Sequence, residues 1–282
     1  MSSSPHTPGV RPKPLVGHVG ALGLHVMSWN IRRRGTLPSL RPADRWAVRA
    51  PGIRALLRAE GPTLLGLQEA LADQAFFAQH SLGENYRIIG RGRGARGRGE
   101  GTPILYDAER LQLQGWDQRA LSKTPRRPGS RSWGSLHPRI MVSATFRDRV
   151  TGSHFLAINT HLDHLSARAR LMGAHTIGRA LAATSFPAVL TGDLNTGAGT
   201  KPIQELCSGS TLADTWQAAE HRRSQEWDTF ANYQPPRARG RRIDWIFASS
   251  PFRVHSAAVN AQRYAEGWPS DHLPVHAVIS LP

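Results

Sequence analysis

Residues 159–164 read NTHLDH and residues 191–195 read TGDLN, and each run directly follows a short apolar segment. In a β-strand, residues two apart share a face, so Asn159, His161 and Asp163 can point into one cleft. The aspartate and the asparagine of the second run share a face in the same way. These two runs therefore predict a polar site where strands end at one edge of a sheet.

Other short apolar segments in the chain also carry polar residues at one end. These residues are Asn30 after SW, Glu69 after LQ, Asp244 in RRIDWIF, and Asp271 with His272 in SDHLP. Oxygen ligands from carboxylates and amides suit Mg²⁺ or Mn²⁺ rather than zinc, and the pattern predicts metal-assisted hydrolysis. A lone aspartate or asparagine at a strand end is more often a turn former, so the prediction depends on the joint pattern.

Strands and helices are expected to alternate along the chain. Expected strands cover residues 24–31, 63–69, 85–90, 103–106, 111–116, 140–147, 154–160, 187–191, 243–248 and 274–280, and expected helices cover 44–60, 72–82 and 166–182. Residues 218–242 are expected to be mostly loop. The glycines of residues 90–101 (GRGRGARGRGEG) predict a mobile basic loop, and a resemblance to the RGG segments of RNA-binding proteins is the alternative interpretation. Because the polar strand ends come from both halves of the chain, we expect one domain over residues 23–282 after a flexible tail over residues 1–22.

Hydrophobic content, charge and the length of apolar runs indicate which classes of protein and of binding partner fit this chain. The chain has 282 residues, of which 39% are hydrophobic, so it can build a sizeable core. It has 36 basic and 20 acidic residues, and the excess favours phosphate-rich partners, although an arginine-rich genome composition is the alternative cause. The sequence has no apolar run long enough for a membrane span or a secretory signal, which favours the cytoplasm. No obligate protein partner can be inferred.

Six segments in order, SWNI, LQE, NTHLDH, TGDLN, RIDWIF and SDHLPV, resemble the endonuclease/exonuclease/phosphatase superfamily over residues 24–281. The segments LSKTP, PGSRSWG and HPRI are similar to its bacterial branch, which is related to deadenylase and nocturnin-like enzymes. The resemblance implies an α+β fold, the DNase I-like four-layer sandwich of two packed mixed β-sheets flanked by helices. It also implies a divalent-metal-dependent phosphoesterase that uses Mg²⁺ or Mn²⁺.

The resemblance further implies a role for each polar position. Metal ligation would fall to Asn30, Glu69 and Asp271, catalysis to His161, Asp193, Asn195, Asp244 and His272, and substrate binding to Arg139, Asn159 and Asp163. Asp193 resembles the residue that orients or deprotonates the attacking water. His272, held in orientation by Asp244, resembles the histidine that stabilises developing charge on the phosphate.

The positive charge makes a nuclease that acts on nucleic acid or nucleotides the leading hypothesis. The alternative is a phosphatase or phosphodiesterase of a small phosphorylated metabolite, such as an inositol phosphate or a lipid headgroup. A nucleic-acid-binding module with a vestigial site is a third hypothesis, which the complete set of polar residues disfavours. Seven further histidines, among them His137, match no ligand spacing and are interpreted as surface or core residues.

Overall fold

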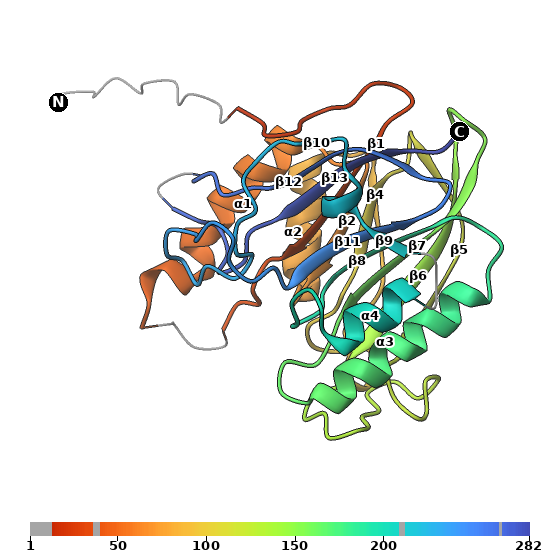
Figure 1. Ribbon diagram of the computed structural model, residues 1–282. Coiled ribbons are helices and arrows are strands. Elements are labelled where there is room, and N and C mark those ends of the chain that lie inside the picture. Colours follow the sequence, from red (N-terminus) through yellow and green to blue (C-terminus); the bar gives the residue numbers. More distant parts are fainter. Residues whose placement is uncertain (1–12, 36–39, 209–211, 265–266) are drawn as a thin grey trace.

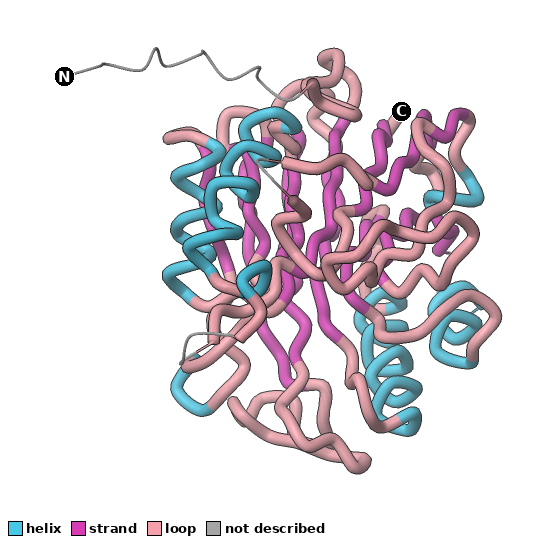
Figure 2. Tube along the Cα trace, turned by 90° about the vertical axis from the view of Figure 1, so that its left-hand side faces the viewer, coloured by secondary structure: helices cyan, strands magenta, loops and turns pink. Residues whose placement is uncertain are grey.

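The computed structural model describes residues 13–35, 40–208, 212–264 and 267–282. Two β-sheets pack face to face, and helices lie on the outer side of each sheet (Figures 1 and 2). The predicted α+β class with two packed mixed sheets and flanking helices is thereby confirmed. No helix in the described ranges is long and apolar enough to span a membrane, and the cytoplasmic location stays a prediction.

The first sheet has seven strands in the order β10-β12-β13-β1-β2-β4-β3. Their bounds are β1 Leu24–Asn30, β2 Leu64–Gln68, β3 Tyr86–Ile89, β4 Ile104–Asp107, β10 His221–Arg222, β12 Arg253–Val259 and β13 Val275–Ser280. The helices α1 (Trp46–Glu60) and α2 (Ala72–Leu82) cover its outer face. Apolar side chains of α1, such as Leu56 and Leu57, pack there against Trp29 of β1.

The second sheet has six strands in the order β5-β6-β7-β8-β11-β9. Their bounds are β5 Leu111–Ala120, β6 Ile140–Asp148, β7 His154–His161, β8 Ala188–Asp193, β9 Leu212–Asp214 and β11 Asp244–Ser249. The helices α3 (Ala167–Ala182) and α4 (Lys201–Ser208) pack on its outer face, and the one-turn α5 (Thr215–Ala218) follows β9. Short 3₁₀ turns occupy Pro42–Asp44 and Ala95–Gly97. Helix α3 starts where its sequence predicts, because the Ser166 hydroxyl accepts a hydrogen bond from the amide of Ala169.

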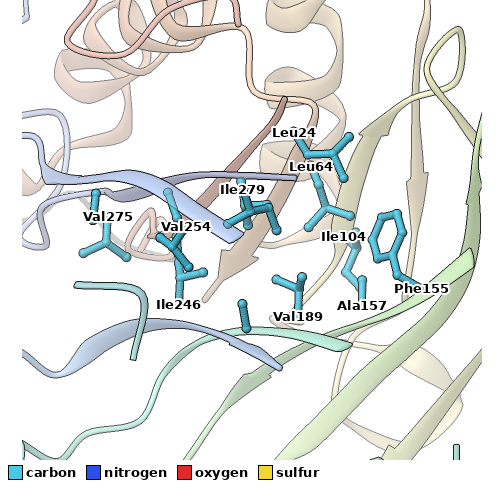
Figure 3. Close-up of a cluster of buried hydrophobic side chains, with 14 of the residues drawn as sticks. Leu24, Leu64, Ile104, Phe155, Ala157, Val189, Ile246, Val254, Val275 and Ile279 are labelled. Atoms are coloured by element: carbon cyan, nitrogen blue, oxygen red, sulfur yellow. The ribbon is translucent and has the colours of Figure 1, made fainter. Parts of the chain in front are cut away.

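The largest hydrophobic cluster lies between the two sheets and joins them into one core. Figure 3 shows part of it, with Leu24 and Ile279 from the first sheet facing Phe155, Val189 and Ile246 from the second. Residues on opposite faces of a strand alternate, so the inner faces of both sheets supply this core while their outer faces meet the helices. The polar strand ends lie at one edge of this core.

Strand register brings those polar ends together. Strands β1 and β2 are parallel and pair Asn30 with Gln68, so Glu69 follows one residue later. Strands β7 and β8 are parallel and pair His161 with Asp193, and β11 runs antiparallel to β8 and pairs Asp244 with the same Asp193. Parallel strands that end at one edge therefore bring residues from distant parts of the chain into a single site.

Several elements and part of the N-terminus differ from the expectation, and the short β9, β10 and α5 are among the elements that were not predicted. Strand β12 and helix α4 were not predicted, because RVHSAAV and KPIQELCS are short and carry few large apolar side chains. Residues 1–12 of the expected tail lie outside the described residues. Within the rest of that tail, the amides of Leu15, Val16 and Gly17 donate to the Glu60 carboxylate at 2.8, 3.1 and 3.0 Å, so this part packs on the domain.

Gly66 lies in β2 and faces Thr191 and Asn159 of the second sheet. A Cβ atom at this position would clash with the Thr191 hydroxyl and lie 2.7 Å from Oδ1 of Asn159. We therefore expect Gly66→Ala to lower the free energy of unfolding by about 3 kcal/mol in a urea titration, since a packed interior cannot shift to admit the atom. Gly115→Ala in β5 is the control, because nothing lies within 4 Å of a Cβ there. Equal midpoints for both variants would contradict close packing at Gly66.

Candidate active site

A cleft of about 470 Å³ opens at the edge where the strands end. Residues from both sheets and from the loops between them line it: Arg32, Arg33, Glu69, Arg93, Glu100, His137, Arg139, His161, His164, Asp193, Asn195, Phe230, Asn232, Ile243, Asp271 and His272. Seven of the predicted site residues belong to this lining, and Asn30 and Asp244 contact lining residues from behind.

Asp193 is the buried carboxylate at the centre of this cleft, and the residue is 1% exposed. Its Oδ2 accepts a hydrogen bond from the Asn30 amide at 3.0 Å and its Oδ1 accepts one from the Asn195 backbone at 2.9 Å. Nε2 of His161 lies 3.4 Å and Nε2 of His272 lies 3.8 Å from Oδ2. Burial and the neighbouring Asp244 carboxylate raise the pKa of Asp193 to about 7. A carboxylate with this pKa suits proton transfer near neutral pH.

The two histidines beside Asp193 have opposite charge states. Burial alone would lower the pKa of His272, but the Asp244 and Asp193 carboxylates raise it to about 10. Asp244 Oδ2 lies 2.9 Å from Nδ1 of His272 and fixes the ring. Burial, followed by Arg139 and Arg93, lowers the pKa of His161 well below its usual value. The site thus places a charged imidazole and a neutral one on either side of one carboxylate.

Glu69 and Asp271 form an acidic pair on the other side of Asn30. Arg32 lies between them, with Nη1 3.9 Å from Oε2 of Glu69 and Nε 3.7 Å from Oδ2 of Asp271. Asn30 donates from Nδ2 to Oε1 of Glu69 at 3.2 Å. Buried Arg49 donates to the carbonyls of Ile31 and Arg32, at 2.6 and 2.9 Å, and thereby holds the loop that follows β1. Glu69 and Asp271 therefore attract a positive charge to a place that Asn30 and the loop after β1 hold in position.

The donor chemistry of Glu69 and Asp271 fits a hard divalent cation, because carboxylate oxygens are the ligands that such ions prefer. Burial opposes ionisation of Glu69, yet His272 and Arg32 hold its pKa below the usual value, so the carboxylate is charged. Asp193, Asp244 and His272 also have ligand atoms within 4.8 Å of one another. That trio is less suitable for a metal, because its two carboxylates keep the histidine protonated and a protonated imidazole offers no lone pair. Asn30 turns its amide NH₂ group, not its oxygen, toward the acidic side chains.

Arg139 is a buried cation on the far wall of the cleft, with only 6% of its surface exposed. Its Nη2 donates to Nδ1 of His164 at 2.8 Å, and its Nε lies 3.7 Å from Asp163 Oδ2. Nε and Nη1 make no hydrogen bond within the described residues. Buried N–H groups without partners are costly, so the guanidinium is ready to bind an anion that enters the cleft.

Two predicted substrate-binding residues lie elsewhere. Asn159 is fully buried between the sheets, where its amide donates to the Leu67 and Pro103 carbonyls at 2.8 and 3.0 Å. Its oxygen accepts from Gln68 at 2.8 Å and Thr191 at 3.1 Å, so no polar atom remains for a substrate. The prediction that Asn159 shares the cleft with His161 is therefore wrong. Although both residues face the other sheet, only His161 stands at the open end of β7.

Asp163 lies behind the cleft wall and is 2% exposed. Its carboxylate accepts hydrogen bonds from the Ser135 hydroxyl at 2.5 Å and from the amides of Leu165 and Ser166 at 2.9 and 2.7 Å. It therefore orients Arg139 and the start of α3, and it does not line the cleft.

Several lining residues were missed in the sequence because they come from loops. Oε1 of Glu100 lies 2.6 Å from Nη1 of Arg93 and its Oε2 lies 3.5 Å from Nε of Arg33, so it neutralises two cations of the cleft. His137, interpreted as a surface or core residue, lines the cleft and stacks on His164 with ring centroids 6.0 Å apart. Phe230 is 46% exposed, and its ring centroid lies 5.0 Å from that of His272. No spacing rule predicts such positions.

An acidic pair that attracts a cation, a protonated histidine and an arginine with unpaired N–H groups together suit an anionic phosphate ester. This is the chemistry of a metal-dependent phosphoesterase. The profile of the Endonuclease/Exonuclease/phosphatase family matches residues 27–272, and the chain belongs to that family. It is a phosphoester-hydrolysing enzyme, as the sequence predicts.

Solved structures agree with this family. A mannosyl-6-phosphatase and an endonuclease/exonuclease/phosphatase family protein, both from Bacteroides thetaiotaomicron, are each 29% identical to this chain with a TM-score of 0.85. The alignments cover 92% of this chain and 100% and 98% of those proteins, respectively. The human nocturnin catalytic domain shares the fold, at 18% identity and a TM-score of 0.67 over 92% of this chain and 94% of that domain. Among curated proteins, none matches this sequence.

Replacing Asp244 by asparagine is expected to shift the alkaline side of the pH–activity profile. The raised pKa keeps His272 protonated until the pH approaches 10, so activity that needs the imidazolium is lost only as the pH rises through that value. Without the Asp244 charge the pKa of His272 falls, and the alkaline limb of kcat/KM should move down by about 1–3 pH units. Asp107→Asn, on β4 and outside the cleft, is the control. An unmoved limb in Asp244→Asn would mean that activity does not depend on the protonated form of His272.

Proposed function

We propose that the chain is a Mg²⁺- or Mn²⁺-dependent phosphodiesterase that acts on nucleic acid or nucleotides. The observation that supports a phosphate ligand most directly is Arg139, whose buried Nε and Nη1 lack partners and whose side chain lines the same cleft as Asp193 and His272. Guanidinium N–H groups bind phosphate oxygens strongly, and a phosphate oxygen that accepts from Nη1 would satisfy that buried donor.

Each of several cleft residues has its own role in hydrolysis. Arg139 binds a non-bridging phosphate oxygen, and the protonated His272 donates a hydrogen bond to the phosphate as negative charge develops. Asn195 orients the attacking water, and Asp193 accepts its proton as the water oxygen bonds to phosphorus. The P–O bond to the leaving alkoxide breaks, and the alkoxide takes up a proton from solvent. A divalent metal held by Glu69 and Asp271 would supply Lewis-acid polarisation of the phosphate.

The charge of the cleft favours a diester over a more highly charged group. Glu100 pairs with Arg33 and Arg93, and the acidic pair faces Arg32. Among the described lining residues, Arg139 is the arginine that keeps buried N–H groups without partners. A single negative charge on a phosphodiester suits this balance, and the half-exposed ring of Phe230 offers a flat surface for a base or a sugar.

A second candidate is a phosphatase of a small phosphorylated metabolite. The observation that favours it is the similarity to the mannosyl-6-phosphatase, at 29% identity over 92% of this chain. A sugar ring could pack on Phe230 as a base would, and Arg139 could bind a terminal phosphate. Inositol phosphates and lipid headgroups belong to the same chemical class.

Hydrolysis assays with purified protein separate the two candidates. Single-stranded DNA, oligo-RNA, duplex DNA, bis-p-nitrophenyl phosphate, mannose 6-phosphate and an inositol phosphate are each offered with Mg²⁺, with Mn²⁺ and with EDTA. We expect EDTA-sensitive cleavage of a polynucleotide that is lost in Asp193→Ala. Turnover of the phosphate monoesters alone would reject the phosphodiesterase and support the second candidate.

A further inference from the structure

A second hollow, of about 370 Å³, adjoins the catalytic cleft, and Arg93 lines both. Its walls are the glycine-rich segment 91–97, the exposed middle of edge strand β5 and the loop at residues 125–128. We call it the arginine groove and define it by Arg91, Arg96, Trp116 and Arg126. The two hollows share Arg93 as a wall residue and are therefore neighbours.

The glycine-rich wall is folded, which differs from the mobile loop that its composition predicts. The amides of Gly92, Arg93 and Gly94 donate to the carbonyls of Gly97, Glu100 and Arg98 at 2.9–3.1 Å. A Cβ on Gly92 would lie 2.5 Å from the backbone of Arg98, so this tight turn requires glycine. The segment is also tied to β5, since Gln118 accepts from the Arg91 amide at 2.7 Å. The glycine-rich wall of the groove is therefore a folded part of the domain.

The groove carries positive charge that the protein itself does not neutralise. Asp117 is the acidic residue in its lining, and Asp117 pairs with Arg119 at 2.6 Å. Arg93 pairs with Glu100 in the same way. Within the described residues, by contrast, no carboxylate lies within ion-pair distance of Arg91, Arg96 or Arg126, and all three are exposed. Three cations that face one hollow favour an anionic partner with several charges.

Trp116 adds an aromatic surface to these cations. It is 40% exposed, and the Arg91 guanidinium lies 5.9 Å from the centre of its ring. A polyanion without bases, such as polyphosphate, has no aromatic ring that could stack on an exposed indole. Single-stranded nucleic acid uses both features, because its bases stack on aromatic rings while its backbone follows a positively charged groove. A duplex keeps its base faces stacked internally and cannot use the indole in this way.

We propose that the arginine groove binds the single-stranded nucleic acid that flanks the scissile phosphate, with Trp116 stacking on a base and Arg91, Arg96 and Arg126 contacting successive phosphates. This inference rests on the proposed nuclease function, and it adds the strandedness of the substrate and the direction in which the strand leaves the cleft. Arg93 stands where cleft and groove meet.

The test compares two triple variants that lose the same charge. The groove variant is Arg91→Gln, Arg96→Gln and Arg126→Gln. The control variant is Arg58→Gln, Arg147→Gln and Arg149→Gln, at exposed positions on α1 and near the far end of β6. All are made on an Asp193→Asn background, so that a labelled twelve-nucleotide oligothymidylate stays intact while its Kd is measured by fluorescence anisotropy at increasing salt.

We expect the groove variant to bind the oligonucleotide at least about tenfold more weakly and to lose about two units of the slope of log Kd against log salt, from three phosphate contacts on a single strand. The control variant should keep the slope of the Asp193→Asn protein. Trp116→Ala should weaken binding about tenfold and abolish the tryptophan quenching that accompanies it. Equal losses in the two triple variants, or duplex bound as tightly as single strand, would overturn the proposal.

Catalysis is read separately, with Asp193 intact. We expect the ratio of kcat/KM for the oligonucleotide to kcat/KM for bis-p-nitrophenyl phosphate to fall at least about tenfold in the groove variant and less than twofold in the control. An unchanged ratio, with the oligonucleotide still cleaved by the unmodified protein, would overturn the groove alone. An oligonucleotide that binds the groove but is never cleaved would overturn the nuclease function and leave the binding site.

Discussion

Asp193→Asn is expected to lower kcat about 10³-fold while KM changes little. The carboxylate lies at the centre of the cleft with a pKa of about 7, and an amide of the same shape cannot accept a proton from water. A loss of this size corresponds to about 4 kcal/mol of transition-state stabilisation. The measurement is steady-state turnover of bis-p-nitrophenyl phosphate with saturating metal ion.

The asparagine also changes local hydrogen bonding, and this must be separated from the chemistry. Both carboxylate oxygens of Asp193 accept hydrogen bonds, from the Asn30 amide and from the Asn195 backbone. The NH₂ group of an asparagine would meet one of these donors, which costs about 1–3 kcal/mol of stability. Urea unfolding measures that cost, and turnover is compared at a temperature where both proteins are folded. A kcat within tenfold of the unmodified protein would show that another group accepts the proton.

The pH profile distinguishes a missing base from a disturbed site. In the unmodified protein, activity should fall as the pH drops through about 7, because Asp193 then takes up a proton and can no longer act as a base. The residual activity of Asp193→Asn should lack this acid limb. A variant that retained the limb would place the titrating base elsewhere in the cleft.

Local sequence patterns predict the strand ends of this fold well, because alternation and chain order determine them. Asp193 is the last residue of β8, and Glu69 comes directly after β2. In both cases the end of the apolar run in the sequence indicates where the strand ends. Alternation failed at Asn159, because a period of two assigns a face but not a depth along the strand. Asn159 lies two residues before the end of β7. There β2 covers the face that Asn159 shares with His161, and Gly66 leaves room for the Asn159 side-chain amide.

The loop residues of the site could not be predicted for a different physical reason. His137, Glu100 and Phe230 reach the cleft because long connections fold back over the strand ends, and their positions depend on contacts formed in the folded chain. Which arginines keep an unneutralised charge could not be predicted from the sequence either. Composition gives the total, whereas pairing in space decides that Glu100 neutralises Arg93 and that Arg91 keeps its charge available.

Glu69→Gln is expected to raise the Kd for Mn²⁺, measured by titration calorimetry without substrate, by about 100-fold or more. The residue follows β2 with a φ of 57°, a left-handed conformation that turns its carboxylate toward Asn30, Arg32 and the cleft. His272 and Arg32 hold its pKa low, so the carboxylate is charged and able to bind a cation. Glutamine keeps the shape but loses the charge that a divalent ion requires. Thermal unfolding should be almost unchanged, because glutamine keeps a side-chain oxygen that can accept from Asn30 or from the Arg33 amide.

Glu100→Gln is the matched control for this prediction, since both carboxylates line one cleft. Glu100 forms ion pairs with Arg93 at 2.6 Å and with Arg33 at 3.5 Å, so two guanidinium groups already neutralise it and repel a further cation. We therefore expect its loss to change the Kd for Mn²⁺ less than about threefold, because an ion so close to two arginines would gain little from the carboxylate. Equal weakening by both substitutions would place the metal between Glu69 and Glu100, whereas weakening by Glu100→Gln alone would exclude Glu69 as its ligand.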